Sequence, residues 1–565
     1  MKRLISILTV CLVLIICICS CNVQGDPTPP DIQDTTQSSQ TVTTEPDTSE
    51  PVTSEPDTSE PGATESDTTE SNTTESDTTE SDTTDRTQPP VDCTHKDNDD
   101  NGICDECTVS VMVAVDFYAI NDLHGKFNDT DSQPGVDELS TYLQNATKTD
   151  DHTVIFSSGD MWQGSSESGL TKGLIVTDWM NEMGFAFMTL GNHEFDWGEQ
   201  TVRDNQALAQ FPFLAINIYN RDTQSLADYC TPSILIDKGD IQIGVIGAIG
   251  DCYSSISADK VEDVYFVTGK ALTELIKTES EALRAQGADM IVVSMHDGGS
   301  SSGSVVSDGS LSSYYDVTLS DGYVDLVFEG HTHRNYVQKD SKGVYHLQGG
   351  GDNDGITHAE VHVNSVTGTL VVTTAEYLPT QRYEALDDHP VVEQLNQKYA
   401  DQLAAGNVVL GYNAKVRYSN QIKQKVAELY LAYGLERWDA KYDIVLGGGY
   451  LNTRAPYDLA KGDVQYSDLQ MLLPFDNQIV LCSIKGSDLL NRFINTSNSS
   501  YYIALSDYGN GVKNSIDRNA TYYIITDSYC ASYAPNRLTV VETYDQTTFA
   551  RDLIADYIQG GGWSQ

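Results

Sequence analysis

Residues 187–196, with the sequence FMTLGNHEFD, join a short apolar run to a glycine, an asparagine, a histidine and two acids. Similar junctions follow four other apolar runs: 109–120 before NDLHG, 153–158 before GD, 289–295 before a histidine, and 324–329 before GHTH. Apolar runs of this length are typical of buried strands, and helix-sized segments such as 269–286 lie between them. The pattern predicts an α/β fold in which polar side chains meet where the strands end.

The side chains at these five junctions carry the carboxylate, imidazole and carboxamide groups that borderline divalent ions prefer. The candidates are Asp122, His124, Asp160, Asn192, His296, His331 and His333. A single Asp or His after a strand is usually a cap or a surface residue, but five similar junctions are hard to explain in that way. We therefore predict two divalent ions (Zn, Mn, Co or Fe) that share a carboxylate, activate a bridging water and bind phosphoryl oxygens.

These junctions also carry a family resemblance. The strings that carry it are Asp122-x-His124, Gly159-Asp160 with Gln163-Gly164, Gly191-Asn192-His193-Glu194, His296, and Gly330-His331-Thr332-His333. They resemble the signature of calcineurin-like metallophosphoesterases. With Phe195-Asp196 included, they are most similar to the 5'-nucleotidase and periplasmic UDP-sugar hydrolase family, over roughly residues 110–550.

The resemblance implies a layered β-sandwich flanked by helices, followed by a second α/β domain that binds substrate. It implies release of phosphate from nucleotides by a metal-activated water. UDP-sugars, nucleoside di- or triphosphates and 2',3'-cyclic nucleotides stay open as alternative substrates.

Residue roles in the metal domain also follow from the resemblance. One ion is assigned to Asp122, His124, Asp160 and His333, and the other to Asp160, Asn192, His296 and His331, so that Asp160 bridges. Family members often carry Gln where His333 stands. His193 would not bind metal but would face the phosphate, oriented by Asp196, and stabilise developing charge.

In the second domain, the resemblance assigns a phosphate contact to Arg417 and a substrate contact to Arg454, which follows a glycine loop containing Gly448. Arginine binds anions through two parallel hydrogen bonds, and glycine permits close backbone approach. Phe475 and Tyr529 stand where the family stacks two aromatic rings on the base. Taken singly, such aromatic residues belong more often to a core.

The chain departs from the family pattern in two places. Leu446 stands where the family usually has an asparagine that contacts the base. The string Tyr533-Ala534-Pro535-Asn536 replaces a common Gly-Gly-Asp-Gly string. Both changes concern base and sugar recognition, so they leave the preferred nucleotide open.

Residues 1–21 are typical of a signal peptide: a basic start and an apolar run that ends in ICSC. That ending resembles a bacterial lipobox, which implies lipid attachment at Cys21 and an extracytoplasmic, membrane-anchored protein; plain secretion and a retained anchor are the alternatives. Residues 22–92 are rich in Thr, Ser, Glu and Pro, and 26–90 hold 17 Asp/Glu and one Arg. Such a segment cannot bury apolar surface, so we expect a disordered acidic tether.

Residues 93–108 form a short island with two sets of metal-ligand types. Asp97, Asp99 and Asn101 match the start of a calcium loop, although Thr108 stands where an acid should close it. A second set, Cys93, His95, Cys104 and Cys107, suits zinc or a disulfide. Calcium, zinc and a disulfide all stay open here.

The remaining chain divides into a catalytic domain at 109–386, a linking helix at 387–410 and a substrate-binding domain at 411–565. His389-Pro390 is typical of the start of that helix and Gly406 of its end. The formal net charge of −50 argues against a nucleic-acid polymer as partner. Two other classes stay open: a surface binding protein on an inactive scaffold, which predicts lost ligands, and a hydrolase of non-nucleotide phosphates.

Overall fold

The computed structural model describes residues 93–130, 134–299, 314–454, 456–533 and 538–565. The predicted signal peptide, Cys21 and the acidic segment 22–92 lie outside the described residues, as do residues 534–537. Within the described ranges, no helix combines the length and apolar character that a membrane crossing requires.

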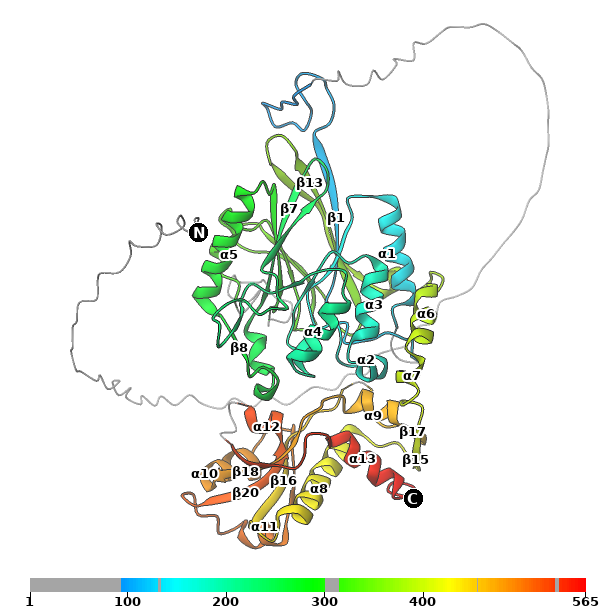
Figure 1. Ribbon diagram of the computed structural model, residues 1–565, viewed down its shortest axis with the longest axis vertical. Coiled ribbons are helices and arrows are strands. Elements are labelled where there is room, and N and C mark those ends of the chain that lie inside the picture. Colours follow the sequence, from blue (N-terminus) through cyan, green and yellow to red (C-terminus); the bar gives the residue numbers. More distant parts are fainter. Residues whose placement is uncertain (1–92, 131–133, 300–313, 455, 534–537) are drawn as a thin grey trace, which may run out of the picture. The chain divides into compact units, whose positions relative to one another are not determined.

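Two six-stranded sheets form the first domain (Figure 1). The first has the order β14 (Leu370–Pro379), β13 (Gly355–Asn364), β1 (Met112–Ile120), β2 (Val154–Ser157), β3 (Met188–Thr189), β4 (Phe213–Leu214). The second has the order β11 (Asn335–Lys339), β12 (Tyr345–Gly349), β10 (Leu326–Glu329), β9 (Met290–His296), β7 (Gln242–Ile249), β6 (Ser233–Asp237). The central strands are parallel: β1 with β2 and β3, and β7 with β9 and β10.

Aromatic side chains join the inner faces of the two sheets. Phe328 of the second sheet lies 4.9 Å from Phe156 and 6.1 Å from Phe117 of the first, between ring centroids. All three side chains are almost fully buried, and burial of one such ring stabilises the fold by roughly 1.5–3 kcal/mol. This core fixes the spacing of the sheets, so the carboxyl ends of the parallel strands in both sheets meet at one edge.

Helices cover both outer faces of the sandwich (Figure 1). Those near the first sheet are α1 (Asp137–Thr149), α2 (Ser166–Thr171), α3 (Leu174–Met183) and α4 (Glu199–Leu208). On the second sheet, α5 (Gly269–Ala285) packs against β7 and β9 through Leu272, Ile276 and Leu283. The predicted α/β sandwich flanked by helices is confirmed, and each of the five predicted strands is present as β1, β2, β3, β9 or β10.

The helix expected between 390 and 405 is present as two helices, α6 (Pro390–Lys398) and α7 (Ala400–Leu403). His389 caps α6, and Pro390 occupies its first turn, as the sequence predicts. The division falls at Tyr399, whose φ of −98° and ψ of 12° leave the helical region. Its hydroxyl donates to the Asp178 carboxylate at 2.8 Å, so a tertiary contact with α3 accompanies the break.

The second domain is built on a five-stranded sheet with the order β19 (Tyr501–Leu505), β16 (Ile444–Tyr450), β20 (Thr521–Asp527), β18 (Ile479–Lys485), β21 (Thr539–Thr543). Its long helix α8 (Ser419–Trp438) packs against β16, β19 and β20. Further elements are β15 (Val409–Asn413), β17 (Gly462–Gln465), α9 (Tyr466–Leu472), α12 (Ser528–Ser532) and α13 (Ala550–Gln559). Mixed helices and strands in a second domain were predicted, and this is confirmed.

Candidate active site

The turns that follow the parallel strands contain an unusual set of backbone angles. Asp122 (φ 51°), His124 (50°), Asp160 (56°), His331 (70°) and His333 (52°) all adopt left-handed conformations. For a residue other than glycine this costs roughly 1–2 kcal/mol. Strain of this kind persists only where surrounding contacts enforce it, and it concentrates at functional sites.

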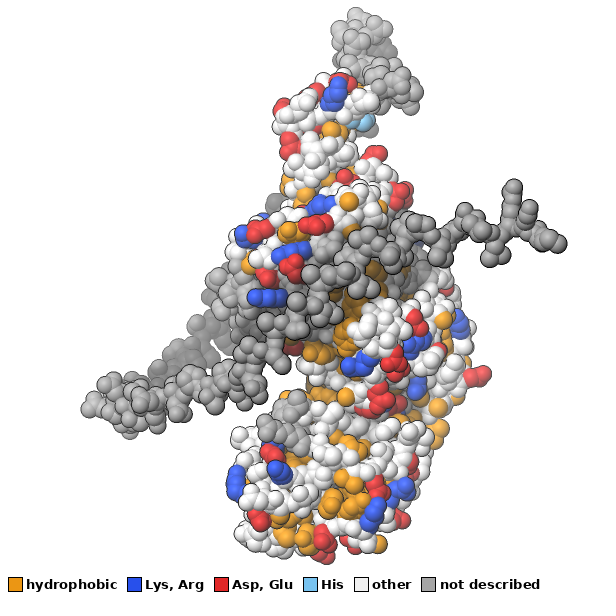
Figure 2. Space-filling view, turned by 60° about the vertical axis from the view of Figure 1, so that its left-hand side comes forward, with side chains coloured by type: hydrophobic (Ala, Val, Ile, Leu, Met, Phe, Trp, Pro, Cys, Tyr) orange, Lys and Arg blue, Asp and Glu red, His pale blue; other side chains and the backbone are white. Residues whose placement is uncertain are grey.

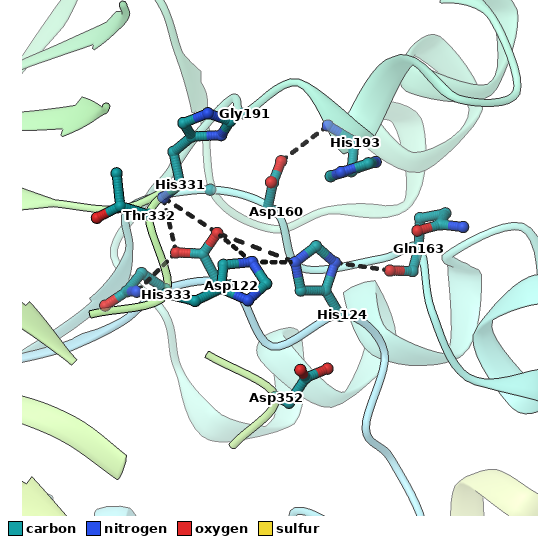
Figure 3. Close-up of polar contacts among 12 residues, drawn as sticks. Asp122, His124, Asp160, Gln163, Gly191, His193, His331, Thr332, His333 and Asp352 are labelled. Atoms are coloured by element: carbon teal, nitrogen blue, oxygen red, sulfur yellow. Dashed lines mark hydrogen bonds and ion pairs between the residues drawn. The ribbon is translucent and has the colours of Figure 1, made fainter. Parts of the chain in front are cut away.

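Three of these residues form one ligand group (Figure 3). His124 Nε2 lies 2.9 Å from His333 Nε2, and His333 Nε2 lies 3.4 Å from Asp122 Oδ1. His124 Nδ1 lies 2.8 Å from the Gln163 carbonyl oxygen, to which it donates, so its Nε2 carries a lone pair. The free nitrogens and the carboxylate are therefore directed at one point, as metal ligands are.

A second ligand group contains buried polar atoms that lack a hydrogen-bond partner. They are Asp160 Oδ2, Asn192 Oδ1 and His296 Nε2. His296 Nδ1 donates to the Ser158 carbonyl oxygen at 2.7 Å, which leaves the Nε2 lone pair facing Asp160 Oδ2 at 3.0 Å. Buried acceptors that face one another without a donor fit a cation between them.

The two groups are contiguous, because Asp122, Asp160 and His296 also lie within 4.8 Å of one another. His331 completes the ring of imidazoles at 5.7 Å from His296, between centroids, and its backbone N–H donates to Asp122 at 2.8 Å. The structure thus brings six of the seven predicted ligands into contiguous groups. The seventh, Asn192, is buried and directly precedes His193, whose backbone N–H donates to Asp160 Oδ1. The chemistry of these side chains fits two divalent ions.

Burial and charge set the protonation states of these groups. Burial lowers the pKa of His124 well below its usual range and that of His331 to about 4, which favours the neutral form that binds metal. Burial also opposes charge on His296, but Asp160 beside it raises the pKa of that imidazole to about 10. Without a cation the pair therefore holds a proton, and a divalent ion would take the place of that proton.

Glu194 is a buried acid whose role is not evident from the sequence. Its carboxylate accepts backbone N–H groups from Asp160 at 2.9 Å, Met161 at 2.8 Å and Gly191 at 2.7 Å. Burial and the nearby Asp160 raise the pKa of Glu194 to about 7. Glu194 lies inside the Asn-His-Glu string, but only the folded chain reveals that it joins two ligand-bearing loops.

His193 lies beside the ligand groups without joining them. Its Nδ1 lies 2.7 Å from Asp196 Oδ2, which fixes the orientation of the ring, as predicted from the family resemblance. Its Nε2 lies 2.8 Å from Arg454 Nη2, and its backbone N–H donates to Asp160 Oδ1 at 2.8 Å. A side chain of the second domain therefore reaches the metal domain at His193.

A cavity of about 380 Å³ opens at this point. Its lining includes Asn192, His193, Asp196, His331, Tyr450, Arg454, Phe475 and Tyr529. The Phe475 ring lies 5.9 Å from the His193 ring, between centroids. The Arg454 guanidinium lies over the Phe475 ring, 5.6 Å from its centroid. The predicted residues Arg454, Phe475 and Tyr529 thus share one cavity with two of the candidate metal ligands, Asn192 and His331.

Two predicted substrate contacts lie elsewhere. The Arg417 guanidinium lies over the Trp563 ring at 5.3 Å and donates to Asn413, outside the lining of the cavity, so its phosphate contact stays a prediction. Gly448 (φ 110°) lies inside β16, where a Cβ would clash with the Tyr502 carbonyl oxygen. In this structure the glycine permits close strand packing rather than substrate approach.

Leu446 and several cavity residues also differ from what the sequence pattern indicated. Leu446 is fully buried in β16, so it makes no contact with the cavity. Tyr450, Asn452, Lys260 and Lys423 line the cavity but lack a sequence motif that marks them. The two lysines add positive charge near Arg454, which an anionic substrate requires.

Charged side chains are interspersed over the described surface in Figure 2. Red and blue groups alternate on this face, and its described Lys and Arg residues form no extended basic area. With a net charge of −50 the chain repels anions at long range, so a phosphorylated substrate depends on local cations such as Arg454.

Comparison with known families decides the class of protein. Residues 115–335 match the calcineurin-like phosphoesterases, and residues 413–540 match the 5'-nucleotidase C-terminal domain. The chain belongs to the 5'-nucleotidase family of metallophosphoesterases. It is therefore a phosphoester hydrolase of a family that uses divalent metals, as the resemblance implied.

Individual relatives extend over most of the chain. Protein UshA of Yersinia enterocolitica is 24% identical over 506 residues, which cover 78% of this chain and 90% of that protein. The cell wall protein Lmo0130 of Listeria monocytogenes is 24% identical over 525 residues, covering 80% and 64%. The 5'-nucleotidase precursor of Thermus thermophilus superposes with a TM-score of 0.60 at 19% identity, covering 79% and 96%, which shows a common fold.

Glu194→Gln tests the link between the two loops. The amide keeps one acceptor oxygen, so at least one buried N–H loses its partner, at a cost of roughly 1–3 kcal/mol. We expect a lower Tm and weaker binding of divalent metal, measured by thermal unfolding and by metal titration of the stripped chain. Glu199→Gln is the matched control, because Glu199 is also buried but accepts from Tyr229. Equal metal affinity in both variants would contradict the role of Glu194.

Proposed function

We propose that this chain is an extracytoplasmic two-metal hydrolase that releases phosphate from nucleotides. The observation that carries the proposal is the set of partnerless buried atoms on Asp160, Asn192 and His296. Of these residues, Asn192 also lines the cavity that holds Arg454 and Phe475. Buried acceptors of this kind favour bound metal ions. The cavity also has the positively charged side chain and the aromatic rings that a nucleotide requires.

Asp122, His124, Asp160 and His333 would hold one ion, and Asp160, Asn192, His296 and His331 the other. Two divalent ions at such a site supply an activated water and neutralise charge on the phosphoryl group. The Asp160 carboxylate is suited to bridging, since it belongs to the group that contains His296 and Asp122. Glu194 holds the backbone of Asp160 in place.

His193 and Arg454 would act on the phosphoryl group itself. Asp196 accepts the His193 Nδ1 proton and leaves Nε2 directed at the Arg454 guanidinium. A phosphoryl oxygen entering the cavity would replace this mutual contact and accept hydrogen bonds from Arg454 and from a protonated His193. Both groups thus stabilise the charge that develops as the phosphorus–oxygen bond breaks.

Phe475 and Tyr529 would hold the base. Both rings line the cavity, and Phe475 lies 5.9 Å from the His193 ring, so a stacked base would lie next to its own phosphate group. Stacking on aromatic rings tolerates any base. A cavity with these two rings would favour nucleotides as a class over phosphate esters without a ring.

The predicted location rests on the sequence alone for this chain. The ICSC string at 18–21 supports lipid attachment at Cys21. The Listeria relative is described as a cell wall protein, which agrees with an extracytoplasmic site. We propose a lipid anchor and an extracytoplasmic catalytic domain.

Phosphate release by the full chain tests the proposed reaction. The substrates are AMP, ADP, ATP, UDP-glucose, 2',3'-cyclic AMP and p-nitrophenyl phosphate, assayed after metal removal and after addition of Mn²⁺ or Zn²⁺. We expect metal-dependent release that Asp160→Asn abolishes. His193→Gln should lower kcat by roughly 10²–10⁴-fold while the bound metal stays unchanged. His152→Gln, at a surface ion pair with Asp150, is the control. No release from any substrate with any metal would refute the proposal.

Phe475→Leu tests base stacking. Loss of one stacking ring costs roughly 1–3 kcal/mol, so the KM for the preferred nucleotide should rise about 5- to 100-fold. The KM for glycerol 2-phosphate should change little, because that substrate has no ring to stack. Tyr412→Leu removes an exposed ring outside the cavity and serves as the control. An equal change for both substrates would instead assign Phe475 to the shape of the phosphate site.

Cys21→Ala tests the anchor. Lipid attachment requires the thiol, so the wild-type chain should partition with membranes and the variant should leave them after cell fractionation. Cys19→Ala changes a neighbouring thiol of the same string and should leave the partition unchanged. Membrane association that survives Cys21→Ala would point to a retained signal segment.

A further inference from the structure

The island at 93–108 brings together four side chains that the proposed reaction does not use. Cys93, His95, Cys104 and Cys107 come from two ends of the island, yet their ligand atoms all lie within 4.8 Å of one another. Cys93 Sγ lies 3.7 Å from Cys104 Sγ, and Cys107 Sγ lies 3.4 Å from His95 Nδ1. From this juxtaposition we infer that the island is a structural zinc site with three sulfur ligands and one nitrogen ligand.

The distances favour a tetrahedral metal over a disulfide. Four ligands at the Zn–S distance of about 2.3 Å stand about 3.8 Å apart along each edge of a tetrahedron, and a shorter Zn–N bond reduces the S–N edges. The observed separations of 3.7 and 3.4 Å match these edges. A disulfide would bring two sulfurs to about 2.05 Å, and all the island cysteines are free.

The backbone supports the same assignment. The Lys96 N–H donates to Cys104 Sγ at 3.5 Å, and the Asp105 N–H donates to the Lys96 carbonyl oxygen at 2.7 Å. A donor aimed at sulfur stabilises a thiolate and orients it toward a metal.

The island needs such a cross-link because it has almost no core. Its buried residues are Asp97, Gly102 and Cys104, and its strand pairing is limited to one bridge between Ile103 and Ser110. A segment this small cannot be held by apolar burial, and metals commonly take over that function. Four zinc ligands would close the segment into one rigid loop.

The acidic residues of the island have a different role in the structure. Asp97 accepts the N–H groups of Asn101 at 3.0 Å and Gly102 at 2.8 Å, and the Asn364 side-chain amide at 2.6 Å. Asp100 accepts from Thr367 at 2.7 Å. These bonds attach the island to the turn between β13 and β14, so the zinc loop would clamp the segment before β1 onto the sandwich (Figure 1).

Cobalt substitution of the full chain tests the site, because thiolate ligands give Co²⁺ a sulfur-to-metal charge-transfer band that oxygen and nitrogen ligands do not give. The reduced wild-type chain should bind about one equivalent of Co²⁺ with this band, and Zn²⁺ should displace it. Cys93→Ser and Cys107→Ser should each abolish the band. Both residues are only partly buried, so these variants perturb folding less than a change at Cys104.

Two control variants separate this site from the rest of the molecule. Cys230→Ser removes a thiol outside the island and should leave the band unchanged. Asp160→Asn, which removes a ligand of the proposed active site, should also leave it unchanged, so the two proposals fail or succeed independently. Zinc content by mass spectrometry should fall by about one equivalent in the island variants and in neither control.

Several outcomes would overturn the inference. One is the absence of the charge-transfer band in the reduced wild-type chain. Another is a band that Cys93→Ser and Cys107→Ser retain but Cys252→Ser removes. That result would assign the cobalt to the active site, because Cys252 lies near His296 and His331. A Cys93–Cys104 disulfide in peptides of the freshly isolated chain would replace zinc by a covalent link. Calcium recovered from the island in place of zinc would assign the site to its acids.

Discussion

A single buried carboxylate, that of Glu194, accepts backbone N–H groups from both Asp160 and Gly191. Those two loops follow β2 and β3, and both carry candidate ligands. The left-handed turn at Asp160 is unfavourable for a side-chain residue, so it needs such an external contact to persist. Position 191 also requires glycine, because a Cβ there would clash with Asp160 Oδ1. The metal-binding geometry therefore depends on a buried carboxyl group that acts on the backbone of the ligand-bearing loops.

The second domain depends on that geometry in turn. Arg454 meets His193 at 2.8 Å only because the loop after β3 holds His193 against Asp160 and Asp196. Phe475 of the second domain likewise lies beside His193 and Arg454. Neighbouring contacts maintain this arrangement: Lys260 of the first domain donates to the Asp476 carbonyl oxygen at 3.2 Å, and Arg551 pairs with the Asp476 side chain.

The sequence predicted those parts of the site that lie within a few residues of one another in the chain. An apolar strand followed by Asp, His or Asn is a short-range pattern, and each of the five strands is present with its ligand types at the carboxyl end. Contacts between distant segments were not predictable in the same way. Glu194 acts through backbone groups, Gly448 packs against β19, and the helix break at Tyr399 accompanies a hydroxyl contact with Asp178. Each of these depends on which elements become neighbours, and periodicity does not contain that information.

The order of residues along the chain has a consequence for how such proteins diverge. All candidate metal ligands of the active site lie before residue 334. The tyrosines and the phenylalanine that line the cavity all lie at residue 430 or later. An exchange of the gene segment after α7 would keep the metal ligands and His193 and would replace Arg454 together with the rings that hold the base. Descendants of one ancestral enzyme can in this way inherit the same metal-binding chemistry and act on different substrates.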